Sequence, residues 1–261
     1  MRPSRILFYL SLLGLAPVPL AAHFHLAIPD RPALRVGEKT VLRFFFGHPF
    51  EHEMADMPPP EGLKLLPPEG AAEDVTSRVV EEKVKGPGQG EIRRYAIEFA
   101  PKDRGDYIFS LHTRAEFAGE KYGFFRDFVK VVVHVQAEKG WDRPVGDPVE
   151  VVPLARPYGL RPGAIFQARA LFDGKPIEGA GVEIERYNPG PPARIPEGEF
   201  ITPTARTGPG GLIAFVPDAA GWWSVSVSTR RGTLLREGKE HPHTVRATFW
   251  FYCGEPLGAG R

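Results

Sequence analysis

Apolar positions in this chain recur in short runs with the period of a β-strand rather than that of a helix. In residues 93–99, for example, Tyr95, Ile97 and Phe99 alternate with polar neighbours and so share one face. Gly, Pro and Asp bound the runs as turn residues, and no long helical period follows residue 22. The strands predicted in this way cover residues 39–46, 93–99, 105–112, 128–135, 149–152, 164–172, 180–184, 212–216, 222–228 and 244–252.

A charged, turn-rich segment at residues 137–147 divides these strands into two groups. The number and spacing of the strands in each group fit a β-sandwich. We therefore expect an all-β protein with two tandem immunoglobulin-like sandwiches, at residues 23–136 and 148–255, followed by a short tail at 256–261. A single elongated sandwich is the alternative arrangement.

The first 22 residues have the pattern of a secretory signal peptide. Two arginines precede an apolar run at residues 6–15, prolines follow it, and small residues end at Ala22. The apolar run is too short, and too soon interrupted by proline, to span a bilayer. We expect cleavage between Ala22 and His23, export to the periplasm or beyond, and no stable membrane insertion of the mature chain. An uncleaved anchor is the alternative.

Composition narrows the function further. The chain has 33 basic and 32 acidic residues, and loss of the two leader arginines leaves 31 against 32. This balance gives no reason to expect a nucleic-acid partner. The single cysteine, Cys253, excludes an intramolecular disulfide and is interpreted as a small apolar residue of a terminal strand. The sequence contains neither G-x-S-x-G nor H-E-x-x-H, and we expect no enzyme activity.

Cleavage after Ala22 would leave the segment His23-Phe24-His25 at the start of the mature protein. A free amine, two deprotonated amides and the imidazole of His25 can enclose a metal ion in a plane of four nitrogens. This geometry suits Cu(II) and Ni(II). The imidazole of His23 can instead bind the ion together with its own amine.

A second group of candidate ligands lies in a polar loop at residues 47–53. It contains His48, Glu51 and His52. Imidazole suits Ni, Cu, Zn and Co ions, and carboxylates can complete the ligand set or orient a ring. The two histidine rings would share a face only if the segment were helical, and the alternative is a solvated polar turn.

Three more histidines are weaker candidates. His112 ends a predicted strand, and a sandwich can place it at the end that carries the mature terminus. His241 and His243 precede the last predicted strand, and their rings share a face if the chain there is extended. A polar hairpin loop is the alternative for this pair. His134 lies inside an apolar strand and is interpreted as structural.

Several longer motifs accompany these histidines. They are A-H-F-H (22–25), G-E-x-x-x-L-x-F (37–44), F-G-H-P-F-E (46–51), W-D-x-x-x-G-D-P-V-E-V-V-P-L (141–154), D-G-K-P-I-E-G-A-G-V (173–182) and P-D-x-x-G-W-W-S (217–224). Together they resemble the exported accessory proteins of bacterial energy-coupled nickel and cobalt importers. That family is often labelled a domain of unknown function or a nickel-transport component.

The resemblance implies a periplasmic protein that carries Ni(II) or Co(II) as cargo, with Cu(II) also possible, and that meets the membrane components of an importer. Carried onto this chain, it implies metal ligation by His23, His25 and His48, with Glu51 and His52 as additions. Two other functions stay open. One is a copper-binding histidine-brace protein or oxidase, and the other is a structural or adhesive β-sandwich without metal.

Overall fold

A computed structural model describes residues 23–86 and 90–255. The predicted signal peptide (1–22) and tail (256–261) lie outside the described residues. Within the described ranges, no helix is both long and apolar enough to cross a membrane.

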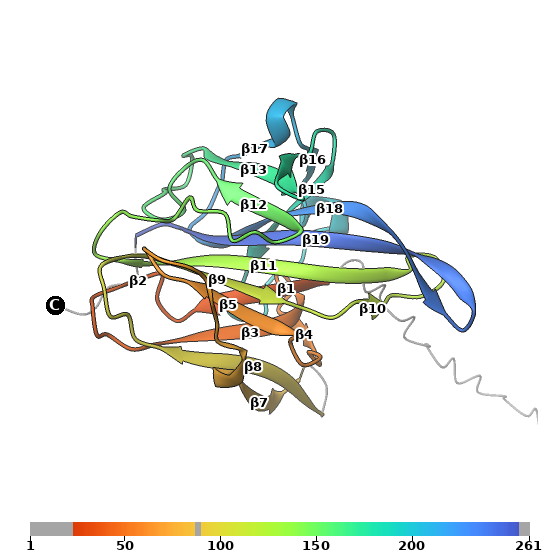
Figure 1. The fold of residues 1–261 in the computed structure, drawn as a ribbon, viewed down its shortest axis with the longest axis horizontal. Helices are drawn as coiled ribbons and strands as arrows, with labels where there is room; N and C mark the ends of the chain where they lie inside the picture. Colours follow the sequence, from red (N-terminus) through yellow and green to blue (C-terminus); the bar gives the residue numbers. More distant parts are fainter. Residues whose placement is uncertain (1–22, 87–89, 256–261) are drawn as a thin grey trace, which may run out of the picture.

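The strands form three sheets that lie in layers (Figure 1). The first sheet has the order β1 (Phe24–Pro29), β3 (Thr40–His48), β8 (Glu91–Phe99) and β7 (Val80–Lys85), with β4 (Glu53–Ala55) beside β3. The central sheet has the order β16 (Thr204–Arg206), β15 (Gly181–Tyr187), β18 (Gly221–Arg236), β19 (Lys239–Cys253), β11 (Phe124–Val135), β9 (Gly105–His112), β5 (Gly62–Leu66) and β6 (Glu73–Asp74), with β2 (Ala33–Leu34) and β10 (Glu116–Phe117) beside β11. The third sheet has the order β12 (Val149–Pro153), β13 (Phe166–Phe172) and β14 (Lys175–Pro176), with β17 (Leu212–Phe215) beside β13. Short 3-10 turns lie at Thr76–Arg78, Gly198–Phe200 and Pro209–Gly211.

The central sheet is apolar on both faces because it separates two cores. On β11, Val131 packs into the core shared with the first sheet, and Val132 packs into the core shared with the third. Phe44 lies in the first core and Phe166 in the second, and both are fully buried. A strand covered on both faces is mostly apolar, and residues 128–135 of β11 follow this rule apart from Lys130 and His134. The predicted all-β sandwich class is confirmed.

The two predicted halves of the chain meet inside the central sheet. Strand β11 of the first half pairs in parallel with β19 of the second, from Phe124↔His243 to Val131↔Trp250. The segment at 137–147 therefore separates the halves along the chain, but the halves share one sheet in space.

A buried ion pair ties this sheet to the third layer. Lys130 Nζ on β11 lies 2.6 Å from Glu150 Oε1 on β12, and each side chain is only 3% exposed. Glu150 also accepts hydrogen bonds from the backbone amides of Val145 and Gly146. Burial lowers the pKa of Lys130, against the opposing effect of Glu150. Glu150 thus connects the segment between the halves to the central sheet.

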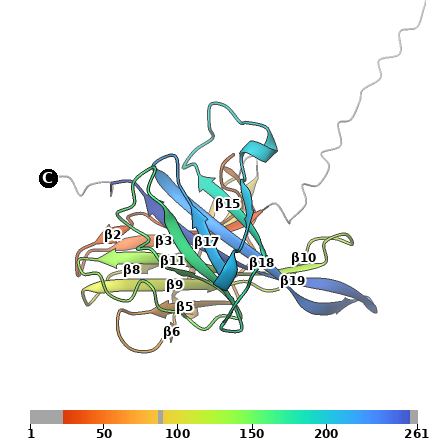
Figure 2. The ribbon, with the colours of Figure 1, turned by 90° about the horizontal axis from the view of Figure 1, so that it is seen from above.

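The hairpin of β18 and β19 extends beyond the sandwich (Figures 1 and 2). His241 and His243 lie within β19 and are buried, so the chain there is extended and the alternative of a polar hairpin loop is wrong. Phe117 of β10 covers this part of the hairpin, with its ring centre 4.9 Å from that of His241. The aromatic ring of Phe117 thus helps to bury His241, a polar residue within β19.

Replacing Lys130 by Met should leave the carboxylate of Glu150 buried without its cation. We expect the free energy of unfolding to fall by about 3 kcal/mol, the usual cost of removing one partner of a buried pair. The double variant Lys130→Met/Glu150→Gln should recover much of this loss, because the amide still accepts from the backbone. Urea denaturation measures both, and equal stability of the single and double variants would contradict this interpretation.

Candidate metal centre

His23 and His48 lie side by side at the edge of the first sheet. Strand β1 pairs with β3 in the register Phe24↔Gly47, which sets the residue before β1 opposite the end of β3. The two imidazole rings have centres 4.3 Å apart and an interplanar angle of 47°. Gly47 has φ +151°, and a Cβ there would lie 2.2 Å from the Glu53 carbonyl oxygen. Only glycine therefore allows the tight return from β3 to β4 that positions His48.

His25 is directed to a different partner. It is buried, and its Nδ1 lies 2.6 Å from Oδ2 of Asp127. Because the carboxylate can only accept, Nδ1 carries the proton of this hydrogen bond. A planar four-nitrogen clamp closes through Nδ1 and through backbone amides that here belong to β1. The geometry therefore favours a site built on His23 and His48 over that clamp.

Asp127 and Arg246 hold the segment from His23 to His25 in place. Arg246 Nε donates to Oδ1 of Asp127 at 3.0 Å, and Nη2 donates to Oδ2 at 2.7 Å. The same Nη2 donates to the carbonyl of His23 at 2.7 Å, and Trp250 Nε1 donates to the carbonyl of His25 at 3.1 Å. Burial alone would raise the pKa of Asp127, but Arg246 and His25 lower it well below its ordinary value. The carboxylate is therefore ionised at neutral pH.

His52 faces away from the paired rings. The segment after His48 is a turn between β3 and β4, so the helical alternative is wrong. His52 has φ +58°, and its Nδ1 donates to the carbonyl of Asn188 at 2.9 Å. Asn188 in turn donates from Nδ2 to the carbonyl of Phe50 at 2.6 Å. His52 thus fastens the turn to the loop that follows β15.

Glu51 lies near a second carboxyl group on β15. Its Oε2 is buried and has no hydrogen-bond partner among residues 23–86 and 90–255. Glu185 is 1% exposed and accepts a 2.5 Å hydrogen bond from the hydroxyl of Thr202. Burial, with a smaller contribution from the charge of Glu51, raises the pKa of Glu185 to about 8. Glu185 is therefore mostly protonated at neutral pH.

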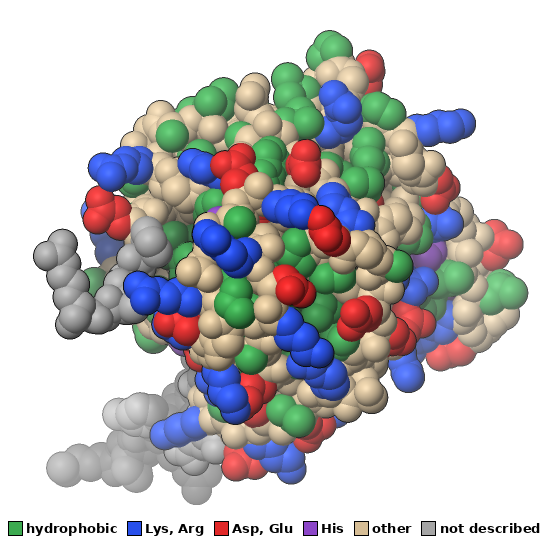
Figure 3. Space-filling model, turned by 60° about the vertical axis from the view of Figure 1, so that its left-hand side comes forward, with side chains coloured by type: hydrophobic (Ala, Val, Ile, Leu, Met, Phe, Trp, Pro, Cys, Tyr) green, Lys and Arg blue, Asp and Glu red, His purple; other side chains and the backbone are tan. Residues whose placement is uncertain are grey.

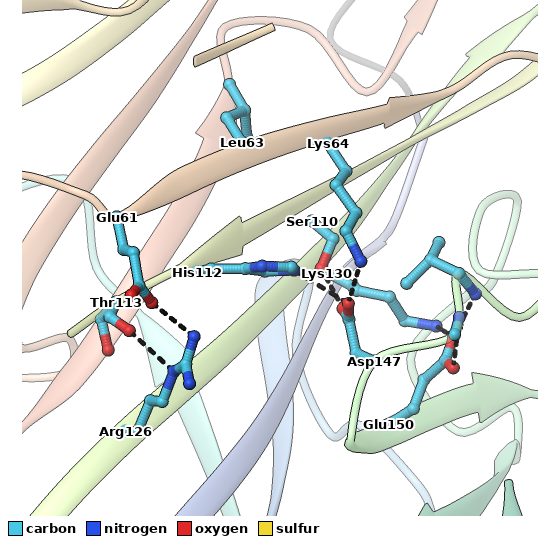
Figure 4. A network of polar contacts seen from close by, with 12 residues as sticks. Glu61, Leu63, Lys64, Ser110, His112, Thr113, Arg126, Lys130, Asp147 and Glu150 are labelled. Carbon is cyan, nitrogen blue, oxygen red and sulfur yellow. Dashed lines mark hydrogen bonds and ion pairs between the residues drawn. The ribbon is translucent and has the colours of Figure 1, made fainter. Parts of the chain in front are cut away.

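His112 belongs to a separate polar network (Figure 4). Its Nε2 lies 2.9 Å from Oδ1 of Asp147, which also accepts from Lys64 at 2.9 Å and through Oδ2 from Ser110 at 2.5 Å. Burial opposes ionisation of Asp147, but His112 and the two donors lower its pKa to about 2. His112 contacts a buried carboxylate here and is not grouped with His23 and His48.

His241 and His134 also have local structural partners. His241 packs on Phe117. His243 differs, because its Nε2 is buried without a hydrogen-bond partner among the described residues, and burial lowers its pKa. His134 contacts Asp106 at 2.8 Å and stacks on Tyr158 at 4.1 Å between ring centres. Across the described part of the chain, no three His, Cys, Asp or Glu side chains are arranged to hold a metal ion. Side chains alone therefore provide a pair of histidines, not a complete ligand set.

If the chain is cleaved after Ala22, as the sequence predicts, the new amine of His23 would supply a further donor. It would add a third nitrogen to the rings of His23 and His48, and such nitrogen-rich sets suit Cu(II) and Ni(II). Two imidazoles bound side by side to one ion, each at about 2 Å, have ring centres about 4 to 5 Å apart. The observed separation of 4.3 Å fits that arrangement. Fold and site together define an all-β sandwich protein with two paired histidines at the edge of its first sheet.

This chain belongs to the family described as "Domain of unknown function (DUF4198)", whose match covers residues 20–231. No curated protein matches the chain in sequence.

Among solved structures, the chain is similar to alpha-2-macroglobulin from Salmonella reacted with methylamine. The identity is 15% and the TM-score 0.27, with 90% of this chain and 15% of that one covered. It is also similar to the D0-D1 domain of intimin, at 10% identity and a TM-score of 0.21. That match covers 86% of this chain and 96% of the intimin chain. A DUF4785 family protein from Legionella pneumophila is 9% identical with a TM-score of 0.29, and the match covers 79% of this chain and 53% of that one. The chain spans about 15% of the length of the Salmonella protein, and likenesses at this level carry no argument about function.

Two residues that hold the backbone and ring of the histidine segment, Asp127 and Arg246, were not predicted as part of the site. Asp127 and Arg246 are charged residues inside otherwise apolar strands. A charged side chain that is buried in a strand needs an oppositely charged or hydrogen-bonding partner. The sequence could therefore have predicted that Asp127 and Arg246 each have one. The identity of the partner was not detectable, because it lies 119 positions away in the chain.

Glu185 predicts a pH dependence of stability. A carboxyl group whose pKa is raised in the folded state binds more protons there than in the unfolded state, so its contribution weakens the fold as pH rises from about 4.5 toward 8. Glu185→Gln should therefore stabilise the metal-free protein more at pH 8 than at pH 5. Urea denaturation at the two pH values measures this, and an equal effect at both would show that Glu185 titrates normally.

Proposed function

We propose that this protein binds a divalent transition-metal ion through the terminal amine and imidazole of His23 together with the imidazole of His48. The observation that carries the proposal is the approach of the two rings, at 4.3 Å between centres. On this proposal cleavage after Ala22 completes the site, and the protein binds its ion without catalysing a reaction.

Pre-positioning of the donors supports the proposal. The carbonyl of His23 is held by Arg246, and Gly47 shapes the turn that carries His48. Phe46 supports the His23 ring from one side, with ring centres 5.0 Å apart and nearly parallel planes. A site held in this way loses less conformational freedom when it binds an ion.

The nitrogen donors favour Cu(II), whereas the family resemblance favours Ni(II) or Co(II); all three are divalent transition-metal ions. Three nitrogens bind Cu(II) most tightly, then Ni(II), then Co(II). The resemblance to importer accessory proteins indicates Ni(II) or Co(II) as cargo, passed to the membrane components of an importer. Availability in the compartment, rather than affinity alone, decides which ion such a site carries.

A copper-binding histidine brace is the second candidate, because it needs the same donors as the proposed site. The approach of His48 to His23 favours it over the planar clamp through His25. Oxidation of a substrate by the Cu(II)-loaded protein with added peroxide would support an oxidase, whereas tight binding without turnover supports a carrier.

The proposal predicts that a free amine on His23 is required for tight binding. Protein beginning at His23 should bind Cu(II) and Ni(II) at least about 100-fold more tightly than protein beginning at Ala22, since even indirect partners of a metal contribute 10- to 100-fold. His48→Ala should cause a loss of similar size. Competition titrations with a chromogenic chelator measure both.

His52→Ala is the matched control, because the imidazole of His52 is directed to Asn188 and away from the site. Its affinity should stay near that of the unsubstituted protein. Affinity should also fall as pH drops through the imidazole range, because ligating histidines must be neutral. Equal affinity of the two N-terminal forms would contradict the role of the amine, and an unaffected His48→Ala would contradict that of His48.

A further inference from the structure

A groove separate from the paired histidines lies where the first sheet meets one end of the central sheet. Its volume is about 590 Å³, within the range of sites for small organic ligands. Strands β1, β3 and β8 form one side, and the end of β15 with the starts of the next loop and of β18 forms the other. We call it the Arg186 groove, after the guanidinium that distinguishes it.

Three arginines line this groove, and two of them have acidic partners. Arg43 pairs with Asp30, and Arg94 donates to Glu82 at 2.7 Å. Arg186 differs, because it makes no ion pair with any residue in the described ranges. The one hydrogen bond of its side chain to the described residues is donated by Nη2 to the carbonyl of Ala220, at 3.1 Å.

The guanidinium of Arg186 has unused binding capacity. It carries five N–H donors in a planar fork that matches a carboxylate. Its Nε is buried without a hydrogen-bond partner among the described residues. A partly buried cation without a counter-ion is costly, and an anion bound beside it would offset that cost. On the face shown in Figure 3, by contrast, basic and acidic side chains are interspersed.

Aromatic side chains form the rest of the wall. Phe45, Tyr187, Trp222 and Tyr252 all line the groove. Phe45 and Tyr187 face each other with ring centres 6.4 Å apart, and Trp222 meets Tyr252 edge to face at 5.4 Å. Such surfaces favour a flat or cyclic apolar group. The aromatic wall and the Arg186 guanidinium together favour a ligand that carries both a ring and a negatively charged group.

We propose that the Arg186 groove binds a ring-bearing organic acid, with its carboxylate on Arg186 and its ring against the aromatic wall. This site is independent of the metal proposal. No donor of the paired-histidine site lines the groove.

The test compares benzoate with benzamide, which has nearly the same shape but no charge, on metal-free protein beginning at His23. Benzoate should bind at least about tenfold more tightly, because hydrogen bonds to ionised groups are about twice as strong as neutral ones. Arg186→Gln should weaken benzoate binding by about tenfold and leave benzamide binding unchanged. Chemical-shift titration by NMR measures the affinities and shows from the rest of the spectrum whether each variant is folded.

Arg206→Gln is the matched control, since Arg206 on β16 also donates to a backbone carbonyl, at 3.0 Å, but lies outside the groove. The Arg206→Gln protein should bind benzoate with an affinity within about twofold of that of the unsubstituted protein. Arg186→Lys, which keeps the charge and loses the fork, should fall between the unsubstituted protein and Arg186→Gln. Absence of benzoate binding up to about 10 mM, equal binding of the two probes, or an equal loss in Arg206→Gln would overturn the proposal.

Discussion

The buried ion pair between Asp127 and Arg246 is the interaction on which the arrangement of this protein depends. The two residues are direct partners in the parallel pairing of β11 with β19, so the pair joins the halves of the chain inside the central sheet. Arg246 also holds the carbonyl of His23, and Asp127 holds the ring of His25. Removal of either partner would leave a buried charge, which typically costs several kcal/mol.

The same pair determines where the two histidines of this segment point. His25 is hydrogen-bonded to Asp127, whereas the ring of His23 lies beside that of His48. The fold therefore positions the rings of His23 and His48, and on the proposed function the third donor comes from processing of the chain. On the proposed function, an uncleaved chain would have the fold without the complete site. Metal binding would then begin only where the leader is removed.

The all-β class and most strands were predictable, because alternation and turn residues are local signals. The three-layer arrangement was not, because the contact between β11 and β19 joins segments far apart in the sequence. The last strand was predicted to begin after His241 and His243, because their polar neighbours in the sequence give no sign that Phe117 covers this segment. His48 was a predicted ligand, but only the register of β1 on β3 shows that it meets His23 rather than His25.

The most direct test of the paired-histidine centre is a crystal structure of the protein that begins at His23, loaded with Cu(II). We expect the ion within about 2 Å of the amine nitrogen and of one ring nitrogen from each of His23 and His48. Arg246 should still donate to the carbonyl of His23, as in the metal-free fold. An ion bound at His112 or at His241 and His243, or bound to His23 without His48, would contradict the account.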